Sequence, residues 1–157
     1  MISRLNRRAM ALVAAVAAAP AHAQESQYCA DLQQVVRLAA AADRFASITG
    51  KMREGSFHDT SRPLAGWKDC TIYGDKTYAC NSEDIATAPA ADEQLNSVVR
   101  QVKACFGEGW WIEDPARTSP PRYVVFHHPI GLTTMTISTD QDGTNVHVVR
   151  LIMFLRN

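Results

Sequence analysis

The sequence predicts an α+β domain in which two helices pack on an antiparallel sheet, in the order α-β-β-α-β-β-β, braced by disulfide bonds. Three observations lead to this fold class. Two segments carry apolar residues at helical spacing, several others alternate apolar and polar residues as strands do, and four cysteines follow an N-terminal export signal. Neither a repeat nor a domain boundary is visible, so residues 24–157 are expected to form one domain.

The N-terminus has the three parts of a secretory signal peptide. Three arginines lie among the first eight residues, an apolar run follows from Ala9 to Ala19, and small residues flank His22 at the cleavage site. The run of about eleven apolar residues is shorter than the roughly 20 that span a bilayer. We therefore expect residues 1–23 to be removed after Ala23, during export to the periplasm or the medium.

The exported part is mildly acidic. Removal of residues 1–23 takes three of the 16 basic residues and none of the 16 acidic ones, which leaves a net charge of −3. This charge, without a Lys/Arg cluster, argues against nucleic acid and anionic lipid as partners. No second apolar segment approaches membrane-spanning length and no cofactor motif is present, so we expect no membrane span and no cofactor.

Two helices are expected. The first runs from Tyr28 to about Ile48, where apolar residues recur at helical spacing, and Gly50 suits its C-terminal end. The second begins near Pro89, which suits a first helical turn, and ends at Gly107.

Four cysteines lie in the exported part, namely Cys29, Cys70, Cys80 and Cys105. An even number of cysteines in an oxidising compartment predicts two disulfides. One disulfide with two free thiols is an alternative, and so is a metal site. No Cys-x-x-Cys pair occurs, which argues against a thioredoxin-type redox centre.

The segment "GWKDCTIYGDKTYACNS" (66–82) helps to choose the pairing. A three-residue loop at 74–76 places Cys70 directly opposite Cys80 and gathers the apolar residues on one face, whereas a two-residue loop would point the two thiols to opposite faces. Directly opposed residues have Cα separations that a disulfide can bridge. We therefore expect Cys70–Cys80. Antiparallel helices would then bring Cys29 and Cys105 together.

The part after the second helix reads as strands. They are expected at Arg122–His127, Leu132–Thr139 and Asn145–Leu155, with a possible short strand at Trp110–Glu113. The last run, "VHVVRLIMFL", is almost continuously apolar and is therefore expected to be central or covered on both faces. Residues 52–66 are the least defined, with "GSFHD" as a possible edge strand.

Three histidines raise the question of a metal site. His127 and His128 are adjacent and His147 follows on the neighbouring predicted strand. Adjacent residues of a strand point to opposite faces, so only one of the pair could join His147. The run "DQDGTN" (140–145) resembles part of a calcium loop but lacks the late bidentate Glu, and a hairpin turn is the expected structure.

Trp110 and Trp111 are the candidate binding residues. Strand alternation places one of them in the core under the second helix and the other outside. An outward tryptophan, near Tyr123 or Phe126 if those strands adjoin, could anchor a ligand or a protein partner.

No catalytic motif accompanies these residues. The sequence has no Gly-x-Ser-x-Gly elbow and no nucleophile next to a base. We therefore expect an exported, non-enzymatic binding or protein-interaction module with a protein or small-ligand partner in the envelope. The alternative is a small periplasmic hydrolase or metal-binding protein that uses His127 or His128 together with His147.

Overall fold

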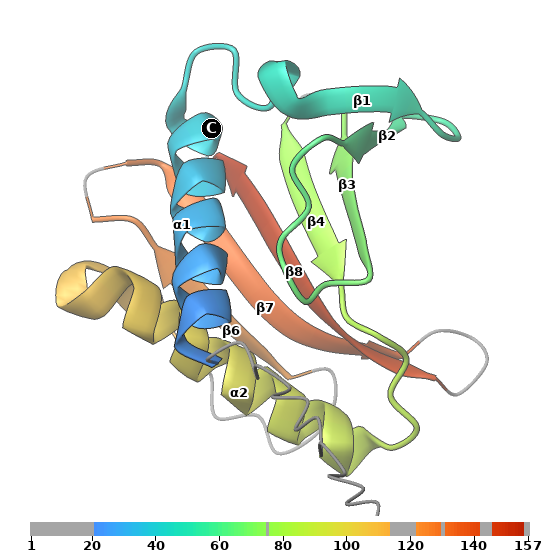
Figure 1. Cartoon of the computed structure of the whole chain (residues 1–157), viewed down its shortest axis with the longest axis vertical. Helices are drawn as coiled ribbons and strands as arrows, with labels where there is room; N and C mark the ends of the chain where they lie inside the picture. Colours follow the sequence, from blue (N-terminus) through green and yellow to red (C-terminus); the bar gives the residue numbers. More distant parts are fainter. Residues whose placement is uncertain (1–20, 75, 114–121, 130, 142–145, 156–157) are drawn as a thin grey trace, which may run out of the picture.

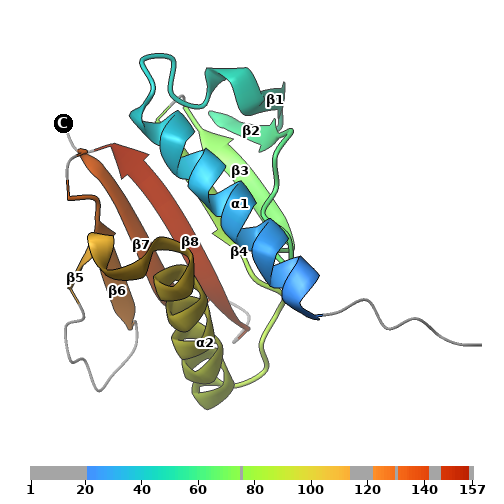
Figure 2. The same ribbon diagram turned by 60° about the vertical axis from the view of Figure 1, so that its left-hand side comes forward.

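The fold is one antiparallel sheet with both helices on the same face, in a computed structural model that describes residues 21–74, 76–113, 122–129, 131–141 and 146–155. Its elements are α1 (Ala21–Ala40), β1 (Thr49–Met52), β2 (Phe57–Thr60), β3 (Asp69–Tyr73), β4 (Thr77–Asn81), α2 (Ala88–Phe106), β5 (Trp111–Glu113), β6 (Tyr123–His127), β7 (Thr133–Gln141) and β8 (His147–Leu155). The strand order is β1-β2-β3-β4-β8-β7-β6-β5. Figures 1 and 2 show α1 and α2 on the same side of this sheet.

The α+β class with two disulfides is confirmed, but the expected element order is wrong. Four strands, and not two, precede α2, and four follow it. The two strands added before α2, β1 and β2, have four residues each and no buried residue, so they show little of the alternation by which a half-buried strand is recognised. The "GSFHD" segment at 55–59 contributes to β2.

The chain also contains a structural repeat that the sequence does not reveal. Each half consists of one helix followed by a four-stranded meander, and the halves join where β4 pairs with β8. Each meander therefore begins at an edge of the sheet, with the short strands β1 and β5, and runs inward to the centre, where β4 meets β8.

The first helix ends earlier than expected. It stops at Ala40, and a short 3-10 helix at Ala46–Ile48 leads into β1, which contains Gly50. Phe45 is nevertheless fully buried, and its ring centroid lies 5.9 Å from that of Tyr78. The apolar spacing thus marks burial correctly, but it does not distinguish one long helix from a helix followed by a tighter turn.

The second helix agrees with its sequence signals. Thr87 caps it, since its side chain accepts a hydrogen bond from the backbone N–H of Ala90 at 3.3 Å. Gly107 ends it with a φ of 63°, a backbone conformation that glycine adopts without strain.

Both disulfides have the expected connectivity. Cys70 lies directly opposite Cys80 in the β3–β4 pair, and their bridge belongs to the buried core. Cys29 and Cys105 form the second bridge, with 5.0 Å between their Cα atoms. Because Cys29 lies within α1 and Cys105 near the end of α2, this bridge ties the two helices together.

The core lies between the helices and one face of the sheet. Its largest fully buried side chains come from both helices and from most strands: Leu32, Phe45, Leu64, Ile72, Tyr78, Leu95, Phe126, Met135, Ile137, Leu151 and Met153. No helix among the described residues is long and apolar enough to cross a membrane. Residues 1–20 of the expected signal peptide, residues 114–121 and residues 142–145 of the expected hairpin turn lie outside the described residues.

Candidate functional site

The site that stands out is the face of the sheet opposite the helices. We call it the outer face; it consists of the side chains of β2–β8 that alternate with the buried core residues. No helix or strand of the described ranges lies over it (Figures 1 and 2). The pairing of each strand with the next allows us to follow single rows of side chains across this face.

One such row is rich in aromatic side chains. From β2 to β5 the cross-sheet row consists of Phe57, Tyr73, Thr77, Phe154, Thr134, His127 and Trp111. It crosses seven strands, and at about 4.8 Å per strand it spans about 29 Å. A further row of mostly apolar and threonine side chains lies beside it: Thr71, Ala79, Ile152, Thr136 and Val125.

The β5 end of the row is a stacked pair. Trp111 is 62% exposed, and its indole lies on the imidazole of His127 with 4.6 Å between ring centroids and 25° between the ring planes. Glu113 Oε2 lies 3.5 Å from Nε2 of the same histidine. Because the imidazole supports the indole from below, the free face of Trp111 is presented to solvent.

Three polar atoms at this end lack hydrogen-bond partners within the described chain. They are both ring nitrogens of His127 and the hydroxyl oxygen of Thr134, and these two residues lie directly opposite each other on β6 and β7. Buried polar groups normally find a partner, so unpaired ones need an explanation. Their clustering beside Trp111, the most exposed large hydrophobic side chain of the described residues, distinguishes this end of the row.

The β2 end carries a second aromatic pair. Phe57 and Tyr73 are 48% and 51% exposed, and their ring centroids are 4.9 Å apart. Beside them, the guanidinium of Arg53 bridges the carboxylates of Asp59 and Asp69. Exposed aromatic groups therefore occupy both ends of the cross-sheet row.

Carboxylates outnumber cations on the outer face. Strands β2–β8 place five charged groups on this face: Asp59, Asp69, Glu113, Asp140 and Arg150. Arg53, which directly follows β1, reaches the same face. Arg150 pairs with Asp140 at 2.7 Å, and Arg53 serves two carboxylates. Glu113 has no lysine or arginine within ion-pair distance in the described chain, so its charge is not neutralised there.

Of the four predicted binding residues, the structure puts two on this face. Trp111 and Tyr123 lie on it, whereas Trp110 is in the core beside the ring of Phe106, at 4.7 Å. Phe126 is also buried, with 1% of its surface exposed. Alternation along β5 and β6 separates each pair, as it must in extended strands.

The three histidines of the metal hypothesis do not converge. His127 pairs with Thr134 and His147 with Gln141 on the same strand, β7; seven residues of strand span about 23 Å. The third, His128, accepts a hydrogen bond at Nδ1 from the backbone N–H of Gly131 at 2.8 Å. Within the described residues no group of three potential ligands could hold a metal ion.

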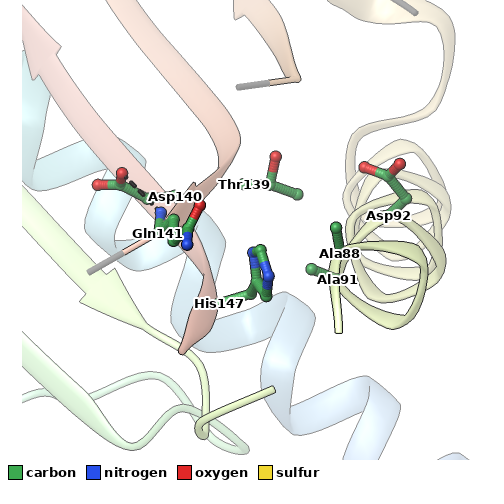
Figure 3. Close-up of a pocket in the computed structure, with 7 residues that line it drawn as sticks. All are labelled: Ala88, Ala91, Asp92, Thr139, Asp140, Gln141 and His147. Carbon is green, nitrogen blue, oxygen red and sulfur yellow. Dashed lines mark hydrogen bonds between the residues drawn. The ribbon is translucent and has the colours of Figure 1, made fainter. Parts of the chain in front are cut away.

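A cavity of about 200 Å³ lies between the start of α2 and the adjoining ends of β7 and β8 (Figure 3). Its lining residues are Ala88, Ala91, Asp92, Thr139, Asp140, Gln141 and His147. The two carboxylates already pair with arginines, Asp92 with Arg122 at 3.7 Å and Asp140 with Arg150. Among the described lining residues the hydroxyl group that accompanies His147 is that of Thr139, whose oxygen already accepts a hydrogen bond from the backbone N–H of Arg122 at 3.1 Å.

Sequence reasoning missed most of the cross-sheet row, although one signal pointed to it. The apolar run of β8 was expected to be central or covered on both faces. It is central in the sheet, but the helices cover only one face. Val148, Ile152 and Phe154 alternate with its buried residues and are only half-buried. The apolar surplus of this strand is therefore presented on the outer face.

Comparisons of the chain with protein-family models, curated proteins and solved structures give no match.

Proposed function

We propose that the chain is an exported, non-enzymatic binding module that holds a protein partner on the outer face of its sheet. The observation that carries this proposal is the cross-sheet row, which places Trp111, Phe57 and Tyr73 on a face that no described helix covers. Tryptophan and tyrosine are the residues that most often dominate the binding energy of protein interfaces.

The size and composition of the face suit a protein better than a small molecule. A width of about 29 Å and strands of three to nine residues give a footprint of about 300–900 Å², and a standard interface buries about 800 Å² per partner. Small-molecule sites are concave. The cavity that we describe lies beside the start of α2, and none of its lining residues belongs to the cross-sheet row. Threonine side chains such as Thr71 and Thr136 surround the aromatic groups and can hydrogen-bond to a partner.

The disulfides and the N-terminal sequence support the exported setting. Two disulfides and no free cysteine are compatible with an oxidising compartment. The predicted signal peptide provides the route. The hydrolase or metal-binding alternative finds no comparable support, because its histidines lie at separate places on the sheet.

The proposal is tested with a variant that blocks the centre of the outer face. Thr136 is half-buried in the middle of β7, and Thr136→Arg adds a long side chain there without changing the core. The matched control, Ala104→Arg, adds the same side chain at an exposed position of α2. We expect mature wild type and the control to capture the same envelope protein from an extract of the host, and Thr136→Arg to lose it. Capture by all three, or by none, would refute the proposal.

A further inference from the structure

We infer that the partner presents an arginine to the β5 end of the cross-sheet row, where its guanidinium stacks on Trp111 and pairs with Glu113; this rests on the proposed function. The indole is open on one side and held by His127 on the other. Tryptophan is the best aromatic platform for a cation, and arginine, whose guanidinium is planar, uses it more often than lysine does.

Charge on the outer face favours the same side chain. Glu113 is 53% exposed at its side chain and contacts only the imidazole of His127 among the ionisable groups of the described residues. Glu113 follows Trp111 by two residues on the same strand, so both side chains point outward with about 7 Å between their Cα atoms. One arginine can therefore stack on the indole and pair with the carboxylate, which it can bind through two parallel hydrogen bonds.

The hydrogen-bonding groups at this end also call for a donor. A carboxylate only accepts hydrogen bonds, so it suits the N–H donors of a guanidinium. The carboxylate of Glu113 is exposed and can receive them, whereas the ring nitrogens of His127 and the hydroxyl of Thr134 are buried and stay out of reach of a group on the free face of Trp111. An acidic partner group would instead face the charge of Glu113.

The outer face as a whole also favours a basic partner. The charged groups named above are four carboxylates and two guanidiniums, and the exported part carries a net charge of −3. A basic partner surface would approach it favourably at long range as well as on contact. The inferred occupant is therefore a protein or peptide surface with an arginine at the β5 end of the row and apolar groups along the rest of it.

The experiment selects a display library of random 12-residue peptides on the mature, disulfide-bonded protein. We expect the selected peptides to share an arginine and to lose at least tenfold in affinity for Trp111→Ala and for Glu113→Gln. Glu93→Gln removes an exposed carboxylate on α2 and serves as the control, which should bind as wild type does. Replacing the shared arginine by citrulline, which is planar but uncharged, should cause a similar loss.

The outcomes separate this inference from the proposed function. Peptides that fail to bind Thr136→Arg but contain no arginine would overturn the inferred partner arginine and leave the proposed binding by the outer face standing. Peptides that bind Glu113→Gln as well as wild type would have the same meaning. A selection without any peptide that depends on Thr136 would count against both. Trp111 is exposed, so its removal should preserve the fold, and Glu113→Gln gives a second readout that does not alter packing.

Discussion

The two disulfides should contribute unequally to stability, and the loops that they close give the magnitude. The Cys29–Cys105 bridge joins residues 76 positions apart, and the Cys70–Cys80 bridge residues 10 apart. The chain-entropy relation gives about 4.5 kcal/mol for the long loop and about 2.8 kcal/mol for the short one. The bridge between the helices should therefore be the main brace, and the hairpin bridge a local one.

The test compares the oxidised and reduced forms of variants that keep a single disulfide. Replacing the buried Cys70 and Cys80 leaves a cavity, but the cavity is the same in both forms of a variant and cancels in the comparison. The variant with both of these changed to alanine keeps only the helix bridge, and the variant with Cys29 and Cys105 changed keeps only the hairpin bridge. In urea unfolding with an m value of about 1.5 kcal/mol/M, reduction should lower the midpoint by about 3 M in the first and about 2 M in the second. An equal or larger loss from the hairpin bridge would refute the reasoning.

Three further perturbations have defined outcomes. Burial raises the pKa of Tyr28 and of Tyr78 well above the usual value near 10. Only the unfolded chain then loses these protons as the pH passes 10, so the free energy of unfolding should fall by about 2.7 kcal/mol per pH unit, and by about half of that in Tyr78→Phe. Urea titrations between pH 9 and 11.5 measure this dependence. If the free energy of unfolding fell as steeply with pH in Tyr78→Phe as in wild type, the buried tyrosines would not be its cause. Gly50→Ala should destabilise by about 1–3 kcal/mol, because its Cβ would lie 3.1 Å from the backbone oxygen of Asp59, and hydrogen exchange should report early opening of β1. Thr87→Ala should lower the free energy of unfolding by about 1 kcal/mol because it removes the cap of α2, whereas Thr87→Ser should keep most of the wild-type stability. Equal thermal midpoints for the two variants would exclude the capping role.

Local pattern predicted those parts of the fold in which burial and polarity coincide. In the β3–β4 hairpin only one register collects Cys70, Ile72, Tyr78 and Cys80 on a single face, and the structure adopts it. The second helix was equally well defined, since Pro89 in its first turn, its apolar stripe and its terminal glycine agree. Such agreement between independent signals makes an element predictable.

The remainder depended on tertiary structure. Phe45 continues the apolar spacing of α1 but packs on Tyr78 from a separate turn, so spacing alone could not locate the end of the helix. The cross-sheet row was less accessible still. It arises from six strand registers and combines residues from both halves of the chain, such as Phe57 and Trp111. A single sequence shows only the apolar surplus of β8, and not the side on which it remains uncovered.

The central claim is that a protein partner covers the outer face, and site-specific photocrosslinking in the host tests it most directly. Benzoylphenylalanine replaces Thr136 on the outer face or Ala104 on α2, and the exported protein is irradiated in intact cells. We predict a discrete adduct with another envelope protein from position 136 and none from position 104. An adduct from position 104 alone would contradict the claim, because it would place the partner on the helices and leave the cross-sheet row without a role.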